Sequence, residues 1–380
     1  MEQQPEHLNV MFHPEYAVPV FGYAVPPLAI IILFTNFFMV WILLKRHMRS
    51  PANTLLVCIA ISNTLAIVFP VAPFVYFYTL GFYEDFVPFA WCRAFFNLVH
   101  VFPLLCNMAS LWSTVALACM RCYSVWRPLH AKSTITPVRT YITIVAIYIL
   151  STLAYTPTIF EYTFIPLSAP SLMNPNTTIV SCHLQQTRTH LSESFCNFHT
   201  WVQIIFTSLL PWFLITFPDF GLLYKLKKTE TERKILMDES CDHREDSKEK
   251  PLVSKTKLIS GRRMTSWMIF IVVSMIWLVE IPFAVSFTLY QSHTNGDVMR
   301  NHLGSSVVFV LLLKYISYPI IFMIYCFMSQ KFRQTFAEMF MCSYKSKYSL
   351  HSTKKASRDS CSESSKKQSI SKLASVSSEC

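Results

Sequence analysis

Residues 23–44 read YAVPPLAIIILFTNFFMVWILL and contain no charged side chain. A helix needs about 20 apolar residues to cross the roughly 30 Å hydrocarbon core of a bilayer. This stretch therefore predicts a transmembrane helix. Residues 1–20 contain no basic segment followed by an apolar one, so we expect the helix to insert directly and to remain in the mature protein.

Six further runs of similar length follow. The seven runs predict an all-α membrane protein, a seven-transmembrane helix bundle with a short amphipathic eighth helix. Prolines inside several runs are expected to act as kinks, because neighbouring helices re-satisfy the backbone groups that proline leaves unbonded. The six runs cover residues 52–80, 92–123, 141–160, 201–224, 265–290 and 305–328 and contain Pro70, Pro103, Pro157, Pro211, Pro282 and Pro319.

Composition agrees with a membrane protein. Hydrophobic residues make up 52% of the 380 residues and charged residues only 14%, whereas soluble domains carry about 25% charged residues. The net charge of +11 is confined to short stretches between the apolar runs. This distribution favours a bilayer over a nucleic acid as the partner.

The distribution of Lys and Arg predicts the orientation. Basic residues crowd the loops after the first, third and fifth runs, whereas the alternate loops hold only Arg93, Arg188 and Arg300. By the positive-inside rule the N-terminus lies outside and the C-terminus in the cytoplasm. The sequon at Asn176 falls in an outer loop, which agrees with this topology, although one such tripeptide also arises by chance.

We therefore expect an extracellular tail at residues 1–22, a seven-helix domain at 23–340 and a disordered Ser- and Lys-rich cytoplasmic tail at 341–380. The tail serines are candidate kinase substrates, or serve only to solubilise the tail. Cys342 follows an amphipathic stretch and is a candidate palmitoylation site.

Cysteine positions favour one disulfide. Of the twelve cysteines, this topology places only Cys92, Cys182 and Cys196 on the oxidising side. A bridge between Cys92 and Cys182 is the favoured pairing and would hold the long second outer loop over the bundle. Cys196 is then left over, at the top of the fifth helix.

Motifs at the helix ends resemble those of rhodopsin-like G protein-coupled receptors over residues 23 to about 340. Arg121 and the downstream Pro128-Leu129 match the inner end of that family's third helix, and Pro211 and Pro282 match its fifth and sixth helices. The other matches are Asn36, Ala60-Ile61-Ser62-Asn63, and Tyr325 followed by Phe332-Arg333.

Longer strings resemble the invertebrate myosuppressin, FMRFamide and sex-peptide receptor group, including its nematode branch. They are HMRSPANT at 47–54, SLWSTVALA at 110–118, LVEIP at 278–282, and SYP with IYC at 317–319 and 324–326. The resemblance implies a plasma-membrane receptor for peptides that end in Arg-Phe-amide. It also implies a heterotrimeric G protein partner at the inner ends of helices 3, 5 and 6.

The chain departs from the family pattern at several positions. Met120 replaces the Asp before Arg121, Asn63 replaces a sodium-binding Asp, and Ile321 stands where helix 7 carries Asn, so a sodium-linked switch is not expected. Cys92 precedes Arg121 by about one helical turn more than usual. The third helix is therefore either extended outward or irregular at its top. The helix 4 Trp is absent.

Glu280 is the most informative single residue. A carboxylate at mid-bilayer depth costs a few kcal/mol and usually marks function. One hypothesis is that it receives the Arg of a ligand through a bidentate pair. The other is an internal salt bridge to Lys314, and the two arrangements could alternate. Lys314 lies one residue, about 100° of rotation, from the position of a retinal-binding Lys, so we do not expect a retinal protein.

Weaker candidates complete the site. His100, Pro103 and Asn107 lie on the outer half of the third helix, where they line a pocket or simply pack. Arg121 is expected to face the G protein, with Asp219 as its carboxylate neighbour unless Asp219 is solvated. A last group forms an acidic outer mouth that steers a cationic ligand inward, or is merely solvated: Glu84, Asp85, Glu161 and Glu193.

The sequence thus predicts a neuropeptide receptor that signals by movement of helix 6. Kinases and arrestin are expected at its tail. An environmental chemosensor is the alternative and a transporter the remote one, since the paired broken helices of transporters are not found. The chain also lacks a phosphate-binding Gly loop, an HExxH motif and a pair of Cys-x-x-Cys motifs. We therefore expect no enzyme activity, cofactor or metal.

Overall fold

The computed structural model contains two units, Met1–Ser329 and Gln330–Cys380. The first holds the helix bundle, and the second holds a helical segment at residues 332–338. The structure describes residues 14–82, 87–170, 176, 178–186, 193–206, 210–242, 274–275, 277–286, 289, 297–328 and 332–338.

The first span begins earlier than predicted. α1 (Pro14–Ala17), the π-helix η1 (Val18–Ala24) and α2 (Val25–Leu43) form one continuous helix. The helix therefore begins within the segment that the sequence assigned to the outer tail, residues 1–22. Gly22 lets this helix pack closely against Tyr78, because a Cβ at this position would lie only 3.0 Å from the Tyr78 carbonyl oxygen.

The second span is α3 (Pro51–Phe74) followed by the π-helix η3 (Val75–Thr79). Ser50 caps its start by accepting a hydrogen bond from the Asn53 amide at 3.2 Å, with Pro51 in the first turn. A short 3-10 helix, η2 (Arg46–Met48), precedes it.

The third span settles whether its top is extended or irregular. α4 (Phe89–Phe96), the π-helix η5 (Asn97–Val101) and α5 (Phe102–Trp126) run without a break. A π-helical turn bonds each residue to the fifth along and so accommodates extra residues. The top is therefore irregular, and the π-helix ends at Val101, two residues before Pro103.

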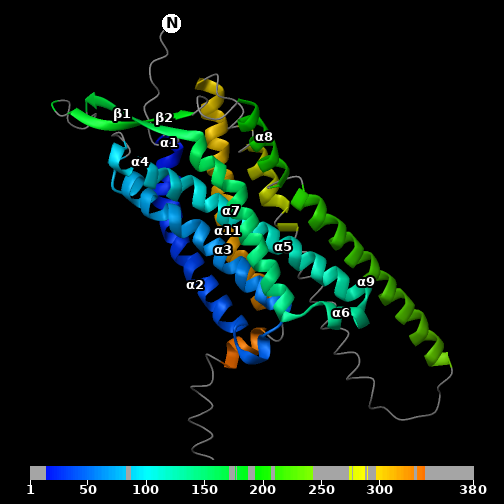
Figure 1. The fold of residues 1–380 in the computed structure, drawn as a ribbon. Coiled ribbons are helices and arrows are strands. Elements are labelled where there is room, and N and C mark those ends of the chain that lie inside the picture. The colour runs from blue at the N-terminus through cyan, green and yellow to red at the C-terminus, as the bar shows by residue number, and fades with distance from the viewer. Residues whose placement is uncertain are drawn as a thin grey trace, which may run out of the picture. The chain divides into compact units, whose positions relative to one another are not determined.

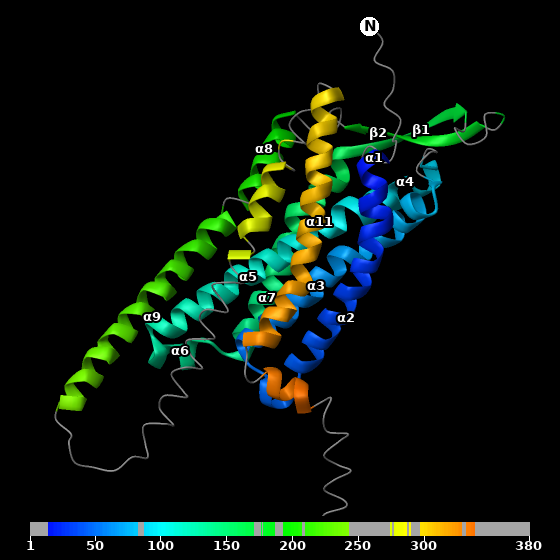
Figure 2. The same cartoon turned by 180° about the vertical axis from the view of Figure 1, so that it is seen from behind.

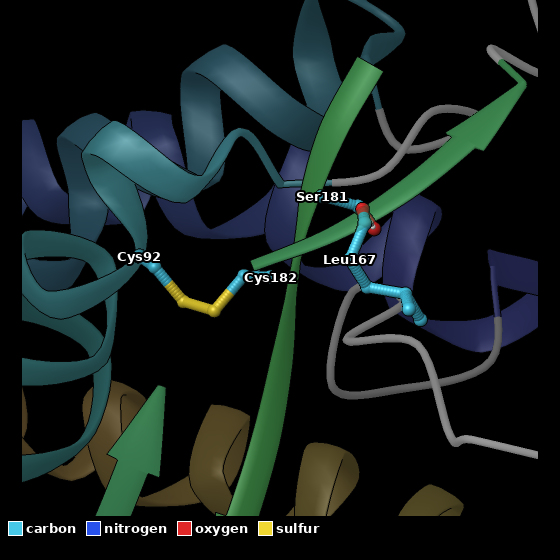
Figure 3. Close-up of a disulfide and its surroundings, with 4 residues drawn as sticks. All are labelled: Cys92, Leu167, Ser181 and Cys182. Carbon is cyan, nitrogen blue, oxygen red and sulfur yellow. Dashed lines mark hydrogen bonds between the residues drawn. A yellow bond between two sulfur atoms is a disulfide. The ribbon is translucent and has the colours of Figure 1, made fainter. Parts of the chain in front are cut away.

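A β-hairpin that we did not predict follows the fourth span. After α6 (Pro128–Thr134) and α7 (Pro137–Glu161), β1 (Tyr162–Pro170) pairs antiparallel with β2 (Thr178–Gln186). Figure 1 shows the hairpin at the end of the bundle where α1 and α4 lie. The disulfide between Cys92 and Cys182 joins it to α4, as predicted, and Ser181 Oγ donates to the Leu167 carbonyl at 2.9 Å (Figure 3).

The remaining spans are α8 (Glu193–Ile204) with α9 (Leu210–Asp242), the helical segment Trp277–Ser286, and α11 (Asp297–Met328). Figure 2 shows α11 running along the bundle beside α2. Five described helices are long and apolar enough to cross a membrane: Glu15–Leu43, Pro51–Thr79, Phe89–Trp126, Pro137–Phe160 and Leu303–Ile324.

Two apolar clusters hold the bundle together. In the first, Phe21 stacks on Phe74 with ring centroids 4.3 Å apart, and Tyr315 of α11 belongs to the same buried group. In the second, Val115 of α5 and Ile215 of α9 are buried together, and Trp277 packs against them. The outward faces are apolar as well, as expected for helices in lipid: Phe34, Phe37, Phe213, Phe217 and Phe220 are all exposed.

Candidate functional site

An ion pair lies inside the bundle. Nζ of Lys314, on α11, donates to Oε2 of Glu280, on Trp277–Ser286, at 2.9 Å. The Lys314 side chain is 4% exposed, whereas that of Glu280 is 20% exposed. The structure thus contains the internal pairing that the sequence left open, and the carboxylate keeps an accessible surface.

Lys314 needs both of the partners that it has. A buried ammonium is costly unless it is paired and hydrogen-bonded. Besides Glu280, its Nζ lies 4.3 Å from the centroid of the Phe283 ring, a favourable cation–π contact. Phe283 follows Glu280 by three residues, so the two side chains share one face of the helix.

A second polar link lies close by. The hydroxyl of Tyr318 donates to Oδ1 of Asn107 at 2.8 Å, joining α11 to α5. Tyr318 lies one helical turn beyond Lys314, on the same face of α11. Two polar links from one face of α11, Lys314 to Glu280 and Tyr318 to Asn107, therefore join α11 to Trp277–Ser286 and to α5.

The other predicted outer residues are only partly placed. His100 lies in η5 with its ring centroid 5.2 Å from that of Phe96, and Pro103 is buried at the start of α5. Asn107 follows Pro103 by one turn and accepts the hydrogen bond from Tyr318. Glu161 ends α7, but its side chain lies outside the described residues.

The acidic outer mouth also falls largely outside the described residues. This applies to Glu84, Asp85 and the Glu193 side chain, and to Cys342 and the rest of the tail. Asn176 is described and exposed, between β1 and β2. Cys196 lies in α8, but its side chain is likewise not described.

The inner end of the bundle departs from our hypothesis that Arg121 pairs with Asp219. Within the described residues no ion pair joins them, and Nε of Arg121 and Oδ2 of Asp219 each lack a hydrogen-bond partner. The physical reason is the rotation of α5 about its axis, which directs Cys122 rather than Arg121 toward α9. Cys122 presents its sulfur to α9, 3.7 Å from the Cβ position of Gly221, and Arg121 is rotated about 100° away.

Pro282 and Tyr325 lie where the sequence placed them along the helices. Pro282 is an exposed residue of Trp277–Ser286, and Tyr325 is in α11 with its side chain outside the described residues. The roles of Pro282 and Tyr325 in activation stay predictions.

Polar contacts between helices mark the matched motif positions. Asn36 donates from Nδ2 to the Ala60 carbonyl at 3.3 Å and to Thr64 Oγ1 at 2.9 Å. The hydroxyls of Ser62 and Tyr148 lie 2.6 Å apart. Tyr148 thus ties the fourth helix to the second although the helix 4 Trp is absent, a contact that sequence reasoning missed.

A bundle of membrane-spanning helices, closed at one end by a disulfide-bonded hairpin and polar at its centre, is the architecture of G protein-coupled receptors. The crystal structure of squid rhodopsin has this fold: its TM-score is 0.62 at 16% identity, with 87% of each chain covered.

The family model described as serpentine type 7TM GPCR chemoreceptor Srw matches residues 24–343, and the chain belongs to this family. The Drosophila melanogaster sex peptide receptor is 30% identical over 337 residues, covering 86% of this chain and 74% of that protein. The Caenorhabditis elegans sex peptide receptor-related protein 2 is 27% identical over 338 residues, covering 85% and 72%.

These relationships confirm the predicted resemblance and fold class. The chain is a multi-pass membrane receptor of the rhodopsin-like, invertebrate type. It is a receptor rather than an enzyme. Membership of this class implies an extracellular ligand and a G protein partner.

Proposed function

We propose that this receptor binds an extracellular amidated peptide of the Arg-Phe type and signals by movement of the Trp277–Ser286 helix. The observation that carries the proposal is the Glu280 carboxylate. It lies inside the bundle, is 20% exposed and uses Oε2 for its ion pair with Lys314.

The chemistry of Glu280 suits an arginine. A guanidinium binds both oxygens of a carboxylate through two parallel hydrogen bonds, whereas an ammonium acts as a point charge. A ligand arginine therefore gains a contact that Lys314 does not make. A mildly acidic mouth, as the sequence predicts, would raise the local concentration of such a cation.

Two further observations favour a peptide. Both curated relatives are named for a sex peptide, and together they match most of this chain. The β1–β2 hairpin lies at the end of the bundle, where an extended ligand could contact it, and the bond from Cys92 to Cys182 fixes its position.

The packing around Trp277 would transmit ligand binding at Glu280 to the neighbouring helices. Its ring centroid lies 6.3 Å from that of Trp212 on α9, and it packs against the cluster that contains Val115 of α5. A shift of Glu280 on the same helix would disturb this contact. The ligand would then favour the conformation in which the inner helix ends accept the G protein.

The proposal includes the orientation and location predicted from the sequence. The N-terminus lies outside the plasma membrane, and Asn176, exposed between the strands, is available for glycosylation. Kinases and arrestin would act at the tail, with Cys342 palmitoylated.

A chemosensory function is the second candidate, because the matching family model is described as a chemoreceptor family. A small environmental cation could use the same carboxylate. The two functions differ in what must contact the hairpin: a peptide is long enough to touch both Glu280 and β2, whereas a small amine is not.

A ligand screen tests the proposal. The full-length receptor is expressed with a promiscuous G protein and exposed to Arg-Phe-amide peptides, their free-acid forms and a panel of small amines. Arg121→Ala, with matched surface expression, serves as the signalling control. We expect responses to amidated peptides at submicromolar concentration. Silence across the peptides, together with a response to small amines, would establish the chemosensor instead.

A further inference from the structure

Lys314 makes the two contacts that a ligand cation would be expected to make. Its Nζ lies 2.9 Å from the Glu280 carboxylate and 4.3 Å from the centroid of the Phe283 ring. Because Glu280 and Phe283 are three residues apart on one helix, the carboxylate and the ring flank a single position. That position is occupied from within the chain.

We propose that Glu280 and Phe283 together form a cation subsite, and that Lys314 is its built-in occupant, which a ligand guanidinium or ammonium displaces. The identity of the displacing ligand rests on the proposed function. The subsite itself rests only on the three side chains.

Burial explains why the position is never left vacant. The Lys314 residue is 3% exposed, so without its carboxylate its charge would be both desolvated and unpaired, which is strongly unfavourable. Glu280 gains in the same way from a permanent counter-ion. The pair therefore stabilises the resting receptor and also links α11 to Trp277–Ser286.

Exchange of one cation for another is feasible because the lysine stem is long and flexible. A ligand cation that enters along the exposed side of Glu280 would take over the carboxylate and release Lys314. One carboxylate cannot neutralise two cations, so ligand and Lys314 compete. Displacement breaks the link between the two helices, which couples occupancy of the subsite to helix movement.

The subsite also predicts selectivity. A guanidinium can bond both carboxylate oxygens and stack its plane on an aromatic ring. An ammonium instead interacts with both groups only as a compact point charge. Phe283 is then a specificity-determining residue, which favours arginine over lysine in the ligand. Among the residues singled out from the sequence, Phe283 was absent, because a Phe in an apolar helix is unremarkable.

Chemical rescue tests the subsite without knowledge of the natural ligand. Lys314→Ala removes an n-propylammonium-sized group, so n-propylammonium and n-propylguanidinium are the probes and n-propanol is the neutral control. The purified full-length receptor is unfolded by heat at increasing probe concentration. We expect a saturable rise in Tm for Lys314→Ala at millimolar cation, larger for the guanidinium, and no rise with n-propanol.

Two double variants identify the groups that hold the probe. The rise in Tm should vanish in Glu280→Gln/Lys314→Ala. In Phe283→Leu/Lys314→Ala, the same rise in Tm should need at least a threefold higher probe concentration. If Lys314→Ala is too unstable to purify, the same cations are added to cell cultures and its delivery to the cell surface is measured against the double variants.

The outcomes separate this inference from the proposed function. Rescue that is equal with n-propanol, or that persists without Glu280, overturns the cation subsite, whatever the peptide screen finds. Rescue that needs Glu280 and Phe283 supports the subsite even if every Arg-Phe-amide peptide is inactive.

Discussion

The hydroxyl of Tyr318 donates a hydrogen bond of 2.8 Å to Oδ1 of Asn107, and this bond joins α11 to α5 one turn from Lys314. Tyr318 is 5% exposed, so neither water nor lipid readily replaces the partner. The bond thus holds α11 in the position from which Lys314 reaches Glu280.

Removal of the Tyr318 hydroxyl should destabilise the receptor. Tyr318→Phe leaves the Asn107 oxygen without this donor, which typically costs about 1–3 kcal/mol for a buried group. We expect a lower Tm for the purified receptor. Asn107→Leu/Tyr318→Phe removes both polar groups and should recover part of the loss. A double variant that is less stable than both single variants would contradict this role for the bond.

The disulfide prediction concerns ligand binding. Cys92→Ser, Cys182→Ser and the double variant should reduce ligand potency to the same extent, because each frees the hairpin from α4. The exposed thiol of Cys119 provides the control, and Cys119→Ser should leave potency unchanged. Potency at matched surface expression is the measurement. Losses that add in the double variant would show that the cysteines act separately.

Asp219 offers a stability test at the inner end. It is 7% exposed, and its Oδ2 lacks a hydrogen-bond partner among the described residues. Because burial of an unpaired carboxylate is costly, Asp219→Asn should raise the Tm of the resting receptor by a few degrees. Glu338→Gln, at an exposed position, is the matched control. A fall in Tm would mean that the charge has a stabilising partner, and Arg121 would again be the candidate.

The sequence predicted the spans and singled out Glu280 and Lys314 for simple physical reasons, with their pairing as one of two hypotheses. Uninterrupted apolar runs have few alternatives to a bilayer, and Glu280 and Lys314 are conspicuous because charges are costly there. The aromatic residues around them were not predicted. Phe283 and Tyr318 look like ordinary membrane residues until the fold brings Phe283 against Lys314 and bonds Tyr318 to Asn107.

The π-helix η1 and the β1–β2 hairpin could not be predicted from the sequence, for a different reason. Pro19 and Gly22 argue locally against a helix, yet η1 forms because Gly22 packs against Tyr78 and its carbonyl accepts from Thr79 Oγ1 at 2.7 Å. The hairpin likewise depends on pairing between distant residues, such as Pro166 with Cys182. Tertiary contacts of this kind override local preference.

Contact between Glu280 and a ligand arginine is the central claim, and a double-mutant cycle tests it most directly. Potency of an active Arg-Phe-amide peptide and of its citrulline analogue is measured on the wild-type receptor and on Glu280→Gln, at matched surface expression. Each single change should cost about 10- to 100-fold. In combination they should cost little more than one alone, because both remove the same contact. Losses that multiply in the combination would show that Glu280 does not receive the arginine.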